Sequence, residues 1–123
     1  MISVVIAAYN TEKYIAKCLE SLKKQTYTEF EAIVVVDGAT DETLGICEEF
    51  SKQDSRFITV CRDNGGLAAA RNTGLEKCTA EYVTFVDSDD YVSPNYLETL
   101  VNAIQINDCD VSACGYILEN EKG

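Results

Sequence analysis

The sequence predicts an α/β fold: one mainly parallel β-sheet with helices on both faces. Short apolar runs alternate with segments of helical periodicity along the 123 residues, and this alternation is typical of βαβ units with right-handed crossovers. The apolar runs are continuous, as expected of strands that are covered on both faces. No internal repeat or linker interrupts the pattern, so residues 1–123 are expected to form a single domain.

Each element follows from a local pattern. Residues 12–25 carry apolar side chains at helical spacing, and so form the first expected helix. Thr40 is expected to cap the second helix, Gly65-Gly66 to precede the third, and Ser93-Pro94 to begin the fourth. The expected strands are residues 2–8, 32–36, 57–61, 82–86 and 110–118.

The charge balance restricts the partners. The formal net charge is −11 and the pI about 4.3, which argues against nucleic acid or anionic lipid as a ligand of a broad basic face. The sequence shows no signal peptide, and no apolar run reaches the ~20 residues that span a bilayer. We expect a cytoplasmic protein, with membrane association only through parts outside this sequence.

The cysteines point to a reducing compartment. There are six of them with no C-x-x-C pair, and the chain has no histidine, so a zinc site is disfavoured. Most have apolar neighbours, and we interpret them as reduced thiols of the core. Without histidine, a Ser-His-Asp triad and a histidine general base are excluded.

The most informative segment is residues 82–90, where an apolar strand leads into Asp87, Asp89 and Asp90. In an extended backbone, Asp87 and Asp89 project to one side and Asp90 to the other. Two carboxylates at ~4 Å repel by about 4 kcal/mol at an effective dielectric of ~20. A divalent cation would offset that repulsion, and a solvated acidic turn that caps the next helix is the alternative.

Polar residues also follow two other expected strands. The first strand leads into Tyr9-Asn10, the second into Asp37-Gly38 and the fourth into Asp87. In a parallel sheet ligands bind beyond the carboxyl ends of the strands, near the point where strand order reverses. These residues therefore predict a binding site at that edge.

Each of these residues has a structural and a functional interpretation. Asp37 could end a strand or accept hydrogen bonds from a nucleobase or ribose. Gly65-Gly66 could be a simple loop or could offer free amides to a phosphate. Arg71 could pair with a nearby acid or face a diphosphate, and Tyr9 could pack in the core or stack on a base. Together they describe a site for a nucleotide diphosphate.

The sequence resembles the family 2 glycosyltransferases of GT-A fold, a Rossmann-like fold, over nearly its whole length. Five motifs occur in the family's order: residues 4–10 (VVIAAYN), 25–27 (QTY), 36–41 (VDGATD), 64–74 (NGGLAAARNTG) and 85–90 (FVDSDD). The resemblance implies that the chain is the donor-binding half of such an enzyme, a partial transferase domain that binds a nucleotide sugar.

The resemblance also implies roles for single residues in binding the nucleotide. Ala7 and Tyr9 would lie against the uracil of a UDP-sugar, and Asp37 would bind its edge. Arg71 would lie along the nucleotide. The chain departs from the family pattern at Ala7, where Pro is usual, at Val36, where an acid is usual, and at Ala39, where Ser is usual; loss of the acid makes the base pocket less polar.

The metal site is implied in the same way. Asp87 and Asp89 would form the family's DxD motif, with Asp87 near the ribose or the metal's waters and Asp89 as a direct ligand. Mn²⁺ or Mg²⁺ would join Asp89 to the diphosphate and stabilise the leaving group.

The resemblance implies transfer to a hydroxyl of a glycan or lipid-linked acceptor in polysaccharide synthesis, with the catalytic base beyond residue 123. An NAD-dependent oxidoreductase is disfavoured because no G-x-G-x-x-G follows the first strand. The remaining alternative is a non-catalytic metal-binding or phospho-receiver-like signalling module. An unpaired sheet edge would favour a homo-oligomer.

Overall fold

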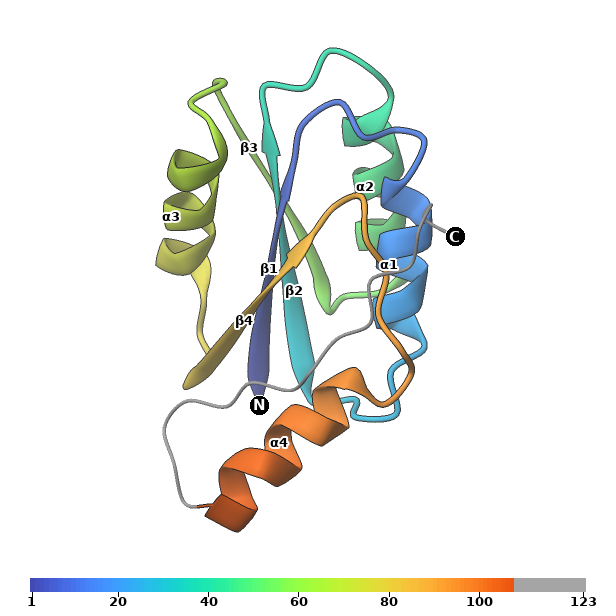
Figure 1. Ribbon diagram of the computed structural model, residues 1–123. Coiled ribbons are helices and arrows are strands. Elements are labelled where there is room, and N and C mark those ends of the chain that lie inside the picture. Colours follow the sequence, from blue (N-terminus) through green and yellow to red (C-terminus); the bar gives the residue numbers. More distant parts are fainter. Residues whose placement is uncertain (108–123) are drawn as a thin grey trace.

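A computed structural model describes residues 1–107 and shows one four-stranded sheet with the strand order β3-β2-β1-β4 (Figure 1). All three pairs of neighbouring strands are parallel. The elements, in chain order, are β1 (Ile2–Ala8), α1 (Ile15–Lys23), β2 (Phe30–Asp37), α2 (Thr43–Gln53), β3 (Phe57–Arg62), α3 (Leu67–Lys77), β4 (Tyr82–Asp87) and α4 (Tyr96–Asn107).

Helices cover both faces of this sheet, as predicted. Helices α1 and α2 lie on one side and α3 on the other (Figure 1). Every residue of β2 is buried, and six of the seven in β1 are, which explains why the sequence shows continuous apolar runs there. The larger core cluster lies under α1 and α2, and a smaller one around Ile33, Val35 and Ala70 lies under α3.

The strand order creates a switch point between β1 and β4. The chain builds the sheet in one direction from β1 through β2 to β3, and then returns to place β4 on the other side of β1. In the ladder between β1 and β4, Ala7 is the partner of Asp87, and in the ladder between β1 and β2, Ala8 is the partner of Val36. The predicted site residues therefore do meet at one edge of the sheet.

Three helix starts differ from prediction, and the first of them is that α1 begins at Ile15 and not at residue 12. Helix α2 begins at Thr43, and its amide donates to Asp41 Oδ1 at 3.0 Å, so the expected cap by Thr40 is wrong. Helix α4 begins at Tyr96, after a turn in which the Tyr96 amide donates to the Ser93 carbonyl at 3.1 Å. The expected strand at 110–118 lies outside the described residues.

The cysteine interpretation is confirmed only in part. Cys18 and Cys47 are buried free thiols, whereas Cys61 is exposed. Its placement in the core was wrong because it lies on β3, an edge strand of the described sheet. Cys109 and Cys114 lie outside the described residues. Within residues 1–107, no helix is both long enough and apolar enough to cross a bilayer.

Candidate functional site

Three carboxylates gather where β4 ends. Oxygen atoms of Asp87, Asp89 and Asp90 lie within 4.8 Å of one another, and all three side chains are exposed. The backbone turns here, because the Asp90 amide donates to the Asp87 carbonyl at 3.0 Å. The expectation that Asp90 points to the other side is therefore wrong, since it assumed an extended chain. We call these three residues the acidic cluster.

The acidic cluster has the donor chemistry of a divalent-cation site. Carboxylate oxygens are the ligands that Mg²⁺ and similar hard cations prefer, and such ions keep several positions for water or phosphate. Exposure of all three side chains leaves room for those further ligands. The residues present therefore fit a bound Mn²⁺ or Mg²⁺.

Arg71 supplies a cation beside this cluster. Its Nη2 lies 3.2 Å from Asp87 Oδ1, and its guanidinium carbon lies 5.5 Å from the ring centroid of Phe85. Helix α3 thus projects Arg71 across β4, which brings it to the predicted edge. The side chains of Arg71 and Asp87 are 39% and 55% exposed, so this ion pair is weak. The guanidinium can therefore change partners with little loss of free energy.

Asp37 occupies a different environment. It is 3% exposed, and its oxygens accept hydrogen bonds from the amides of Gly65 and Gly66, both at 3.0 Å. Arg62 Nε lies 3.1 Å from Asp37 Oδ1. The two glycine amides are therefore not free, and the expectation that they could receive a phosphate is wrong for this structure.

Two glycines permit this close packing around Asp37. Gly38 has a φ of +69°, and a Cβ there would lie 2.7 Å from the Asn64 amide nitrogen. A Cβ on Gly65 would lie 2.5 Å from Arg62 Nη2. The Asn64 side chain in turn donates to the Asp37 carbonyl at 3.0 Å, so the two loops are held together.

Sequence reasoning missed Arg62. Its guanidinium also donates to Thr73 Oγ1 at 2.7 Å and to the Ala69 carbonyl at 3.1 Å, which fixes it between β2 and α3. The signal that could have found it is register: Arg62 ends β3 as Asp37 ends β2, and the two are ladder partners.

Ala7 and Tyr9 lie between Asp37 and the acidic cluster, because β1 lies between β2 and β4. Adjacent strands are ~4.8 Å apart, so the ends of β2 and β4 are separated by roughly 10 Å. Tyr9 is 51% exposed just beyond β1. The next residue, Asn10, accepts a hydrogen bond from the Thr40 amide at 2.8 Å, which ties the loops after β1 and β2 together.

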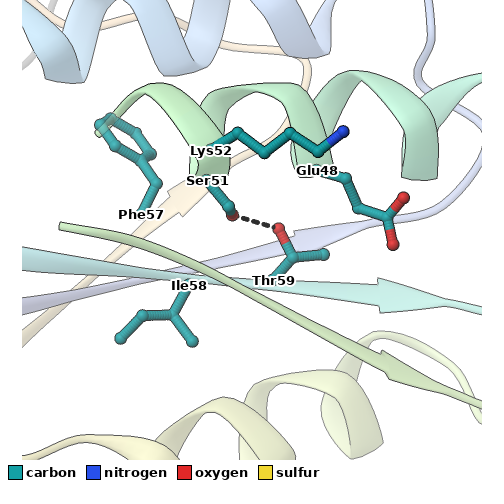
Figure 2. A pocket seen from close by; sticks show the side chains of 6 residues that line it. All are labelled: Glu48, Ser51, Lys52, Phe57, Ile58 and Thr59. Atoms are coloured by element: carbon teal, nitrogen blue, oxygen red, sulfur yellow. Dashed lines mark hydrogen bonds between the residues drawn. The ribbon is translucent and has the colours of Figure 1, made fainter. Parts of the chain in front are cut away.

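A hollow elsewhere on the surface holds none of these residues. It lies between α2 and β3 and is lined by Glu48, Ser51, Lys52, Phe57, Ile58 and Thr59 (Figure 2). Its lining comes from the first half of β3, away from the carboxyl edge of the sheet. A hydrogen bond of 2.7 Å joins the hydroxyls of Ser51 and Thr59.

Fold and site together define an α/β protein with a candidate ligand site at the switch point of a parallel sheet. The model of the family described as glycosyl transferase family 2 matches residues 3–123. The chain therefore belongs to glycosyl transferase family 2, and the family resemblance expected from its motifs is confirmed.

Relatives with this domain are much longer. GlyA of Streptococcus pneumoniae, a glycosyltransferase, is 46% identical over 120 residues, which are 98% of this chain and 17% of GlyA. EpsH of Bacillus subtilis, a putative glycosyltransferase, is 42% identical over 98% of this chain and 35% of its own length. This chain thus spans well under half of each relative.

The structure of TarS residues 1–349 from Staphylococcus aureus, in complex with UDP, superimposes with a TM-score of 0.83. The two chains are 33% identical, and the match covers 96% of this chain and 38% of the other. The likeness to GT-A glycosyltransferase structures confirms the predicted fold.

Proposed function

We propose that this chain binds the donor of a glycosyltransferase reaction, a UDP-sugar, together with a divalent cation. The acidic cluster carries the proposal, because it lies at the switch point of the sheet beside the Arg71 guanidinium. The similarity to TarS, whose structure contains UDP, supports UDP as the nucleotide. The sugar would then be transferred to an acceptor hydroxyl, which we assign to a glycan or lipid-linked acceptor, with UDP as the leaving group.

Asp89 and Asp87 would hold Mn²⁺ or Mg²⁺, with Asp90 as a third carboxylate of the site. Such an ion acts as a Lewis acid that stabilises the charge developing on a diphosphate leaving group. When the donor binds, Arg71 would leave the Asp87 carboxylate and contact the diphosphate, because a planar guanidinium can donate to two phosphate oxygens at once.

Asp37 retains a single acceptor position for the base. An ionised carboxylate has about four lone-pair sites. Among the partners found within residues 1–107, Oδ1 accepts from Gly65 and lies near Arg62, while Oδ2 accepts from Gly66 alone. We therefore assign the remaining site on Oδ2 to one N–H of the uracil edge, with Ala7 and Tyr9 against the ring.

The test is calorimetric titration of UDP into the protein with MnCl₂ and again with EDTA. We expect binding that needs Mn²⁺ and that Asp89→Asn abolishes. Glu76→Gln is the matched control, because it removes one exposed carboxylate from α3 without touching the cluster. Absence of UDP binding in Mn²⁺ would refute the proposal, and Mn²⁺ binding without UDP binding would favour the metal-binding signalling module.

A further inference from the structure

The connection that carries Asp89 and Asp90 of the acidic cluster contains no helix or strand. Residues 88–95 connect β4 to α4 and run alongside α1 (Figure 1). A segment that carries two of three neighbouring carboxylates must be held against their mutual repulsion. Side chains of α1 and of the residues that follow it bind this segment through hydrogen bonds.

Ser21 binds the middle of this segment. Its hydroxyl donates to the Cys18 carbonyl at 2.6 Å and accepts from the Val92 amide at 3.1 Å. One turn earlier on the same face of α1, the Cys18 thiol donates to the Asp87 carbonyl at 3.6 Å. Burial, followed by the charge of nearby Asp90, raises the pKa of Cys18 to about 12, so this thiol keeps its proton.

Gln25 binds the end of the segment. Its side chain is 4% exposed; Nε2 donates to the carbonyl of Ser93 at 2.6 Å, and Oε1 accepts from the amide of Leu97 at 2.9 Å. A second bond from Nε2 reaches the Ser21 carbonyl at 3.1 Å. Cys18, Ser21 and Gln25 thus contact the chain at the start, middle and end of the connection from β4 to α4.

We propose that Ser21 and Gln25 are positioning residues that hold Asp89 and Asp90 beside Asp87 in the geometry that binds the cation. This inference rests on the proposed function, because it assigns the two residues to the same metal site. Groups that orient metal ligands without touching the metal typically change metal affinity by about 10–100-fold when they are removed. A purely structural role would lower stability and leave the affinity unchanged.

The test is titration of the protein with MnCl₂ alone, following free Mn²⁺ by electron paramagnetic resonance. We expect Gln25→Leu and Ser21→Ala each to raise the Kd about tenfold, at the lower end of the range for such groups. Ser21→Thr keeps the hydroxyl and should restore the affinity. Ser51→Ala removes a part-buried hydroxyl bond that joins α2 to β3 and not to the segment, and should leave the Kd unchanged.

Thermal unfolding of each variant checks that it is folded at the temperature of the titration. If Gln25→Leu does not fold, the comparison of Ser21→Ala with Ser51→Ala decides. If those two variants lose stability equally and Ser21→Ala leaves the Kd for Mn²⁺ unchanged, the inference is overturned but the proposed function is not. Failure of the wild-type chain to bind Mn²⁺ would overturn both the inference and the metal part of the proposed function.

Discussion

Glu31 is a buried carboxylate at the amino ends of the strands, on the far side of the sheet from the acidic cluster. It is 7% exposed and accepts hydrogen bonds from the Ser3 hydroxyl, and from the Thr79 amide and hydroxyl at 2.7 and 3.0 Å. It takes part in none of the ion pairs found within residues 1–107. Within the described part of the chain, hydrogen bonds therefore stabilise its charge.

Two substitutions separate the charge of Glu31 from its hydrogen bonds. Glu31→Gln can keep three contacts as neutral bonds. A charged bond contributes about 1.5–3 kcal/mol and a neutral one about 0.5–1.5 kcal/mol, and because the three bonds share one carboxylate charge the differences do not add in full, so we expect a loss of about 1–3 kcal/mol at pH 7. Glu31→Ala removes all three bonds and leaves the buried Ser3 hydroxyl without this acceptor, and we expect a larger loss, about 3–5 kcal/mol.

The pH dependence has a defined sign. Burial acts to raise the pKa of Glu31, but the bonds from Ser3 and Thr79 outweigh it and hold the pKa below the ordinary value of 4.5. A lowered folded-state pKa gives stability that is fully present above the unfolded pKa and is lost as the pH falls through the folded value. The difference between wild type and Glu31→Gln should therefore be constant from pH 7 to about 5 and shrink below 4.5.

The assay is urea unfolding of the three proteins at several pH values, with UDP binding as a control. UDP affinity should not change, because Glu31 lies at the opposite edge from the candidate site. A stability difference between wild type and Glu31→Gln that stays the same at pH 7 and pH 3.5 would refute the reasoning. So would a smaller loss for Glu31→Ala than for Glu31→Gln.

Other regions give further predictions. Gly74→Ala places a methyl group against the Val5 side chain, so we expect urea unfolding to show a loss of about 1–3 kcal/mol from overpacking; unchanged stability would contradict the close contact of α3 with β1. In the native protein, maleimide should label exposed Cys61 quickly and buried Cys18 only after unfolding, as peptide mapping can show; equal rates would contradict this burial. Arg71→Met removes the cation beside the acidic cluster and should tighten binding of Mn²⁺ alone by up to about fivefold, since an exposed ion pair contributes about 1 kcal/mol or less, while UDP binding in Mn²⁺ weakens. If Arg71→Met instead weakens the binding of Mn²⁺ in the absence of UDP, Arg71 does not compete with the cation for the acidic cluster.

The order and type of the elements could be predicted from local patterns. Continuous apolar runs marked β1 and β2, and Gly65-Gly66 marked the start of α3. Parallel strands bring their carboxyl ends to one edge, so the placement of Asp37 and Asp87 at the same edge also followed. The start of α2 was predicted less accurately, with Thr40 as its cap, because caps depend on the path of the loop, which the sequence pattern does not specify.

The sequence by itself determined the fold class and the chemistry available at the carboxyl edge of the sheet, because both depend on residue type and spacing along the chain. Only the tertiary structure decided which groups meet there. It joined Asp37 to Arg62, turned Asp90 toward Asp87, and set Gln25 against the segment before α4. These contacts depend on strand register and on loops packed against distant helices, so burial across the whole domain, and not local pattern, fixes them.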